Sequence, residues 1–514
     1  MSDAKQMKPP SQVKTSWLRA HWTQLSLAAL LLAGFALRMV DLTDAPLDFH
    51  PARQLQGAVI ARSIYYQWAP TQDAYIQEMA LRLRGAVGEY EPPILQSLAA
   101  IGYLLLGGEQ LWVARILTSL AWVLGGWALY ALAARISSPA AGLLALAYYL
   151  FLPFAVYASR SFQPDPLMTA LVTFAAFAAY RWAEARSWKW ALAAALVASL
   201  AMLVKLVAAY LLLGMFAALI LSEIGFRRAL KDRQVWMIAL LCLLPSAAYY
   251  LFARSGSASG YFENWILALL PLAMQPEFYA RWANLLAETM GFAALLAALT
   301  GVLIAPPRAR WLLAGLWLGY LAYGITLPHQ TTTHDYYHQQ LVPILALSMA
   351  PVFALVIEKM GQQGRAWRVL FAGLLVAAIA FNAFVARSNL LAEDHRQEPL
   401  FWERIGQALP TDGKTIGLVQ GYGNLLTFYG WRNIQHWPPA GEFSLNELRG
   451  RSVEDFEEDF LRRTAGMDYF LVTSFNQLEQ QPLLNDYLYA NFPIYEQGDG
   501  YVIFDLHSRQ PGAN

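Results

Sequence analysis

Apolar runs long enough to cross a lipid bilayer recur along the chain, and they limit its possible folds more than any other feature. A helix needs roughly 20 mostly apolar residues to span the hydrocarbon core. Hydrophobic residues make up 57% of the 514-residue sequence and charged residues 14%, whereas an ordinary soluble domain has roughly 25% charged residues. The sequence therefore predicts a polytopic α-helical membrane protein.

The apolar runs and the basic residues between them predict about 11 transmembrane helices. The N-terminal segment, residues 1–23, is basic, so the positive-inside rule places it in the cytoplasm. No small-residue cleavage site follows the first run, which favours a retained span over a signal peptide. The predicted spans cover about residues 24–40, 110–134, 140–158, 166–182, 190–222 (two spans that meet at Lys205), 235–252, 289–305, 311–327, 341–357 and 368–386.

Residues 24–390 thus form a predicted transmembrane module with a large first outer loop, residues 41–109. Within this loop, GAVIARSIYYQWA and AYIQEMALRLRGAV are predicted to be helices lying along the membrane surface. The apolar run 93–106 is shorter than a span and is predicted to be interfacial or partly inserted from outside. With this choice, successive inner loops carry the basic clusters, and the polar candidate residues fall on the outer side.

The composition becomes polar after residue 390, where helix-like pieces alternate with the strand-like runs KTIGLVQ, DYFLVT and YVIFDL. Residues 391–514 are therefore predicted to form a small α/β domain, placed outside by the odd number of spans. The GYGN sequence lacks the spacing of a nucleotide-binding loop and is predicted to be a turn. A balance of 37 basic and 36 acidic residues gives no indication of nucleic-acid binding, and the single Cys242 excludes cysteine-based zinc sites.

Polar residues from five segments are predicted to meet on the outer side. A carboxylate there can deprotonate a hydroxyl or amine that attacks a sugar carbon, and basic groups can hold the phosphate leaving group of a lipid carrier. The first segment is DLTDAPLDFHPAR, residues 41–53, in which Asp41 and Asp44 are interpreted as surface or capping residues. The candidate residues are Asp48, His50, Arg53, Tyr90, Glu91, Asp165, Lys205, His334, Asp335, Tyr337 and His338.

Simpler structural roles stay open for several candidates. Lys205 either extends to the interface from a helix end or contacts phosphate. Asp165 either caps the span that begins at Pro166 or lines the pocket. The histidine spacing in THDYYH permits metal ligation, but no third ligand is evident, so a substrate-binding loop is favoured. The need for a divalent cation therefore stays open.

The order of these features resembles the GT-C glycosyltransferases, specifically the bacterial branch related to protein O-mannosyltransferases and to the lipid A aminoarabinose transferase (glycosyltransferase family 39). The resemblance covers roughly residues 20–390. Two departures stand out: HPAR replaces the HPDE of some members, and Tyr90-Glu91 replaces an acidic residue followed by lysine. The segments that carry the resemblance are EYEPPILQSLAAIGYLLLGGEQLWVARILTSL, SFQPDPLMTA, AMLVKLVAAY and THDYYHQQLVP.

The resemblance implies transfer of a sugar, with inversion, from a polyprenyl-phosphate carrier to a lipid, glycan or protein acceptor at the outer face of the bacterial inner membrane. It implies that Asp48 is the base, with Glu91 as the second candidate, and that Lys205 contacts the carrier phosphate. The other candidate residues would then line the substrate pocket. Two alternatives are a secondary transporter, although the two halves show no repeat, and a catalytically silent scaffold that binds the lipid-linked sugar.

Overall fold

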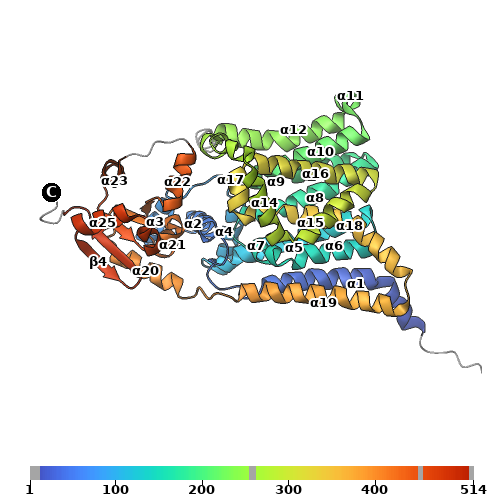
Figure 1. Ribbon diagram of the computed structural model, residues 1–514, viewed down its shortest axis with the longest axis horizontal. Helices are drawn as coiled ribbons and strands as arrows, with labels where there is room; N and C mark the ends of the chain where they lie inside the picture. The colour runs from blue at the N-terminus through green and yellow to red at the C-terminus, as the bar shows by residue number, and fades with distance from the viewer. Residues whose placement is uncertain (1–11, 254–261, 450–454, 509–514) are drawn as a thin grey trace, which may run out of the picture.

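The computed structural model describes residues 12–253, 262–449 and 455–508. Long helices form one body, and a five-stranded sheet with its own helices lies at one end of that body (Figure 1). The long helices are α1 (Gln12–Arg38), α5 (Leu111–Ile136), α6 (Pro139–Phe151), α7 (Pro153–Ser159), α8 (Pro164–Ala185), α9 (Trp188–Val204), α10 (Ala208–Glu223), α12 (Arg233–Ala248), α15 (Phe292–Ile304), α16 (Pro307–Thr326), α18 (Leu341–Gly361) and α19 (Arg365–Leu390).

Every predicted span overlaps one of these helices, or the bent pair α6–α7. By length and composition, four of the described helices can cross a membrane, and six can if each bent pair counts as one span. The bent pairs are α6 with α7, at 62°, and α14 (Pro276–Met290) with α15, at 97°. Helices α9 and α10 have 17 and 16 residues because the chain breaks at Lys205. The figure of about 11 spans therefore stays a prediction.

Local sequence explains where several helices begin. Proline occupies the first turn of α6, α7, α8, α14 and α16, where its missing N–H leaves no hydrogen bond unmade. Asp232 caps α12 through the backbone N–H groups of Gln234 and Val235, and Ser138 caps α6. The N-cap of α8 is Gln163, so Asp165 lies inside the helix and does not cap it.

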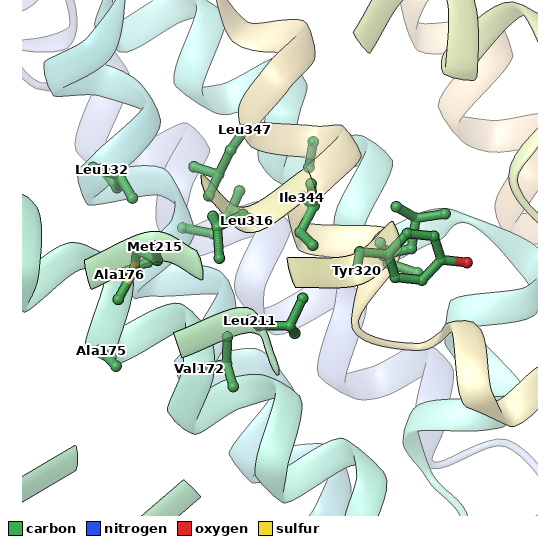
Figure 2. Close-up of a cluster of buried hydrophobic side chains, with 14 of the residues drawn as sticks. Leu132, Val172, Ala175, Ala176, Leu211, Met215, Leu316, Tyr320, Ile344 and Leu347 are labelled. Carbon is green, nitrogen blue, oxygen red and sulfur yellow. The ribbon is translucent and has the colours of Figure 1, made fainter. Parts of the chain in front are cut away.

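The core of the helical body lies where α5, α8, α10, α16 and α18 meet. Figure 2 shows side chains from all five helices in this cluster, among them Leu132, Val172, Leu211, Leu316 and Leu347. Glycines bring α10 and α16 into backbone contact, because a Cβ on Gly214 would collide with the carbonyl oxygen of Gly315. Without a strong hydrophobic drive in lipid, such close backbone approach is a main source of helix–helix attraction.

Three helices of the first outer loop separate the helical body from the C-terminal region, residues 391–508 (Figure 1). They are α2 (Pro51–Trp68), α3 (Ala74–Arg84) and α4 (Ile94–Leu106). Helix α2 packs against α3, α4 and α21 (Asn424–Tyr429), and every residue from Gln54 to Ile64 is buried. The expectation of an amphipathic surface helix was therefore wrong for α2, because protein covers it on all sides. Helix α4 packs against α2 and α5.

The C-terminal region contains a mixed sheet of order β2-β1-β3-β5-β4. The central strands β1 (Thr415–Leu418), β3 (Tyr469–Val472) and β5 (Tyr501–Asp505) coincide with the predicted strand-like runs. The edge strands β2 (Ile434–His436) and β4 (Ile494–Gly498) were not predicted, since β2 has three residues and β4 is exposed throughout. The remaining helices are α20 (Glu398–Ala408), α22 (Ala440–Leu448), α23 (Phe456–Thr464), α24 (Phe475–Glu479) and α25 (Pro482–Asn491).

Candidate active site

The segment between α1 and α2 is held in place by two buried arginines. Arg115 of α5 donates to the backbone carbonyls of Leu42, Asp44 and Ala45, at 3.0–3.3 Å. Arg160, which follows α7, donates to the carbonyls of Val40 and Asp41. Both guanidinium groups are at most 2% exposed. Burial, with the nearby charge of Arg115, lowers the pKa of Arg160 to about 10.

Asp48 contacts the same two arginines. Its Oδ1 accepts from Arg115 Nη2 at 2.9 Å, and its Oδ2 accepts from Arg160 Nη2 at 3.4 Å. The carboxylate is nevertheless accessible, with 22% of the side-chain surface exposed. Two arginines therefore fix its orientation. Sequence analysis did not single out either arginine, although an arginine within an apolar helix is itself a signal of function.

Asp41 and Asp44 bind the start of the C-terminal region. The Asp44 carboxylate accepts from the backbone N–H of His395 at 3.1 Å, and the Asp41 carboxylate pairs with Arg396. These contacts are structural and connect the first loop to the chain that leaves α19 (Figure 1).

His50 pairs with Asp335, which lies 285 positions away in the sequence. The His50 Nε2 to Asp335 Oδ1 distance is 2.7 Å, and about a quarter of each side chain is exposed. His50 has a φ of 47° immediately before Pro51, where the chain normally favours extended backbone. A non-glycine residue in this conformation costs roughly 1–3 kcal/mol and is typical of functional sites.

Aromatic and imidazole rings surround this pair. The ring centroid of His50 lies 4.7 Å from that of Tyr336 and 5.8 Å from that of His334, in a stacked arrangement with His334. Burial, with the positive charge of a protonated His50 nearby, lowers the pKa of His334 to about 4. His334 is therefore neutral at physiological pH and can accept or donate a hydrogen bond.

Arg53 and Glu91 form a bidentate pair between α2 and the segment before α4. Arg53 Nη2 donates to both carboxylate oxygens of Glu91, at 2.8 and 2.9 Å, and the guanidinium carbon lies 5.3 Å from the Tyr90 ring centroid. Burial opposes the charge of Arg53, but Glu91 and Asp165 raise its pKa. The charge of Asp165, at the start of α8, therefore acts on Arg53 of the first loop.

Lys205 and Asp165 form a buried ion pair. The Lys205 Nζ donates to both oxygens of Asp165, at 2.7 and 2.9 Å, and the side chains are 7% and 2% exposed. The ammonium group also lies 5.2 and 5.0 Å from the ring centroids of Tyr336 and Tyr337. Lys205 therefore points into the protein and does not extend to an interface.

His338 has a different environment from the other candidates. It is fully buried, its Nδ1 lies 2.6 Å from the hydroxyl of Tyr320, and its Nε2 lies 2.9 Å from the carbonyl oxygen of Thr331. Because both ring nitrogens already have partners, its contacts are those of a structural residue. Within residues 12–253, 262–449 and 455–508, no three His, Cys, Asp or Glu side chains are grouped so that they could hold a metal ion.

The arrangement brings together side chains from segments that are far apart in the sequence. Asp48 and Glu91 pair with arginines, and Asp165 pairs with a lysine. Asp335 pairs with a histidine. Each acidic side chain of the site thus has a basic partner. Such a site can stabilise a phosphate that leaves and accept a proton from an attacking hydroxyl.

Comparisons with known proteins agree with this picture. Residues 90–252 match the dolichyl-phosphate-mannose-protein mannosyltransferase family. No curated protein sequence matches the chain.

Among solved structures, ArnT from Cupriavidus metallidurans bound to undecaprenyl phosphate is 16% identical and has a TM-score of 0.57, over 94% of this chain and 97% of ArnT. The Archaeoglobus fulgidus oligosaccharyltransferase tethered with an acceptor peptide is 13% identical and has a TM-score of 0.57, over 95% of this chain and 74% of that enzyme. Together, the family match over residues 90–252 and the fold shared with these two enzymes show that the chain is built like known glycosyltransferases.

Proposed function

We propose that this protein transfers a sugar from a polyprenyl-phosphate carrier to a lipid, glycan or protein acceptor at the outer face of a bacterial inner membrane. One observation carries the proposal: ion pairs hold the candidate acids against residues from other segments of the chain. The pairs are Asp48 with Arg115, Glu91 with Arg53, Asp165 with Lys205, and Asp335 with His50. The undecaprenyl phosphate bound to the similar ArnT supports a polyprenyl-phosphate donor. In this arrangement the C-terminal region lies outside the membrane.

The proposed reaction is a single displacement at the anomeric carbon of the sugar. The acceptor oxygen forms a bond to that carbon while the bond to the carrier phosphate breaks, and the electron pair leaves with the phosphate. Asp48 takes the proton of the acceptor hydroxyl, and its two arginines hold the carboxylate toward the acceptor. Lys205 and Arg53 supply positive charge to the phosphate that leaves.

The remaining polar residues orient the substrates in this proposal. Glu91 positions Arg53, and Asp165 positions Lys205, since each carboxylate binds its partner through two contacts. His50, His334, Asp335 and Tyr337 line the sugar side of the pocket, where the neutral imidazole of His334 binds hydroxyl groups. Glu91 is the second candidate for the base, and like Asp48 it accepts from arginine through both oxygens.

Asp48→Asn tests the proposal. We expect transfer of radiolabelled sugar from polyprenyl phosphate to membrane acceptors to fall at least about 100-fold, the usual contribution of a general base. Asp73→Asn is the matched control, because Asp73 is an exposed cap of α3 in the same loop. Full activity of Asp48→Asn at equal expression would show that Asp48 is not the base. Donor binding without turnover by the unmodified protein, across a broad acceptor panel, would favour the silent scaffold.

A further inference from the structure

A cavity of about 550 Å³ is lined in part by residues 43–45, which belong to the same segment as Asp48. Three parts of the protein form its wall: the first loop, the start of α5, and the C-terminal region. The residues that matter for its chemistry are Asp44, Arg62, Trp112, Arg396, Phe428 and Tyr429.

Both arginines in this cavity are already paired with carboxylates. Arg62 Nε donates to Glu109 at 2.8 Å, and Arg396 pairs with Asp41 and with Asp394. The Asp44 carboxylate accepts backbone N–H groups from Ala45 and His395, at 2.9 and 3.1 Å. Each arginine lies beside a carboxylate, and the Asp44 carboxylate adds a further negative charge, so the wall presents planar hydrogen-bonding groups and no excess of positive charge. It therefore suits a neutral polar ligand better than a phosphate.

Aromatic side chains supply the apolar part of the wall. The indole N–H of Trp112 donates to Gln110 at 2.9 Å, which fixes the ring beside the cavity. The guanidinium of Arg62 stacks 3.8 Å from the ring centroid of Phe428, so this side is rigid. A ligand with flat C–H faces and a rim of hydroxyl groups matches such alternating aromatic and polar surfaces.

One buried hydroxyl in the wall lacks a hydrogen-bond partner. The Tyr429 oxygen is inaccessible and has no partner among the residues that the structure describes, and the whole residue is only 9% exposed. A ligand hydroxyl reaches this oxygen only if the Tyr429 side chain turns toward the cavity, and the unmade hydrogen bond of the buried oxygen favours that turn.

We propose that this cavity binds a neutral saccharide. Building on the proposed function, that saccharide is the glycan part of the acceptor. Arg115 connects the two places, because its Nη1 donates to the Asp44 carbonyl at 3.0 Å and its Nη2 donates to Asp48 at 2.9 Å. A saccharide held in the cavity thus lies against the segment that carries the proposed base.

The test uses the full-length protein in lipid nanodiscs and saturation-transfer NMR. The probes are neutral hexasaccharides of glucose, mannose and N-acetylglucosamine, with inorganic phosphate as the anionic probe. We expect at least one hexasaccharide to bind, and Trp112→Ala to weaken that binding at least tenfold. Tyr429→Phe, which removes only the unpaired hydroxyl, should weaken it severalfold. Trp188→Ala, an exposed tryptophan at the start of α9, is the matched control and should bind normally.

The inference is overturned if none of the hexasaccharides binds at 10 mM (about the weakest affinity of interest), if Trp112→Ala and Tyr429→Phe bind as well as the unmodified protein, or if phosphate displaces the saccharide. Undecaprenyl phosphate binding is measured in the same samples. Binding of the lipid without any saccharide would refute this inference and leave the proposed function standing. Binding of a saccharide without the lipid would support this inference and refute the proposed function.

Discussion

At the scale of single residues, pairing decides how each ionisable group behaves. Asp48 and Asp165 are both carboxylates of the candidate site, but Asp48 is partly exposed between two arginines, whereas Asp165 is buried against one lysine. An accessible carboxylate can exchange protons with a substrate, while a buried pair mainly fixes geometry. The chemical roles proposed for them follow this difference.

Removing one partner of the buried Lys205–Asp165 pair should lower the free energy of unfolding more than removing both. We expect Lys205→Met to lower the free energy of unfolding by about 3–5 kcal/mol, because it leaves the Asp165 carboxylate unpaired. The double variant Lys205→Met, Asp165→Leu should regain most of that stability in thermal unfolding. Its transfer activity should stay low, since the phosphate then lacks the charge of Lys205 and retains only that of Arg53. Activity in the double variant would contradict the role proposed for Lys205.

His338 should make the protein sensitive to acid. Burial lowers its pKa to about 4, below the ordinary value of 6.5, so the unfolded chain binds a proton more readily. Stability should therefore be complete above pH 6.5 and fall as the pH drops toward 4, by up to about 3 kcal/mol. Melting temperatures measured from pH 7.5 to 4.5 should decline less steeply in His338→Gln. His507→Gln, at an exposed histidine, should leave the slope unchanged.

At the scale of helices, small residues determine which elements can touch. Gly214, Gly315 and Gly319 let α10 and α16 approach until their backbones meet, and Gly301 does the same between α15 and α18. These contacts bring α18 and the loop that precedes it toward α10, and so bring Tyr336 and Tyr337 to Lys205. Helix packing thus helps to bring the residues of the candidate site together.

Gly315→Leu should separate α10 from α16, because even a Cβ at this position would collide with the Gly214 carbonyl oxygen. We expect the free energy of unfolding to fall by more than about 1–3 kcal/mol, the usual cost of overpacking. This fall should appear as a lower melting temperature of the detergent-solubilised protein. Gly373→Leu on α19 is the control, since no atom lies within 4 Å of its added Cβ. Equal melting temperatures for the two variants would show that the close contact is unimportant.

At the scale of the whole molecule, the candidate site lies between a helical body and a C-terminal region that are joined through α2 (Figure 1). Arg62 of α2 donates to the carbonyl of Phe428 at 2.6 Å and stacks on Trp431. The site and the proposed saccharide cavity therefore both depend on how the C-terminal region docks, and the proposed reaction requires that region to lie outside.

Cysteine labelling tests this orientation. Cys242 is the only cysteine, so Cys242→Ser provides a cysteine-free background. On that background, a membrane-impermeant maleimide should label Asn476→Cys in intact spheroplasts, because Asn476 lies on the C-terminal region. Lys231→Cys, between α11 (Phe226–Ala229) and α12, should react only after permeabilisation. The opposite pattern would place the C-terminal region in the cytoplasm.

Hydropathy and charge were sufficient to predict the helices and the three central strands, since both depend on local composition and period. They also placed the candidate residues on one side of the membrane, and that sidedness stays a prediction. They failed for α2, whose burial depends on a region more than 300 positions away in the sequence.

Pairing was beyond the reach of one sequence. Asp48 joins Arg115 and Arg160 across 67 and 112 positions, and His50 joins Asp335 across 285. Local propensity carries no information on such contacts, because they form only when the helices pack. The sequence alone thus predicted a membrane protein with an outer polar site. Tertiary structure decided which acid meets which base, because charge balance depends on distances that composition does not encode.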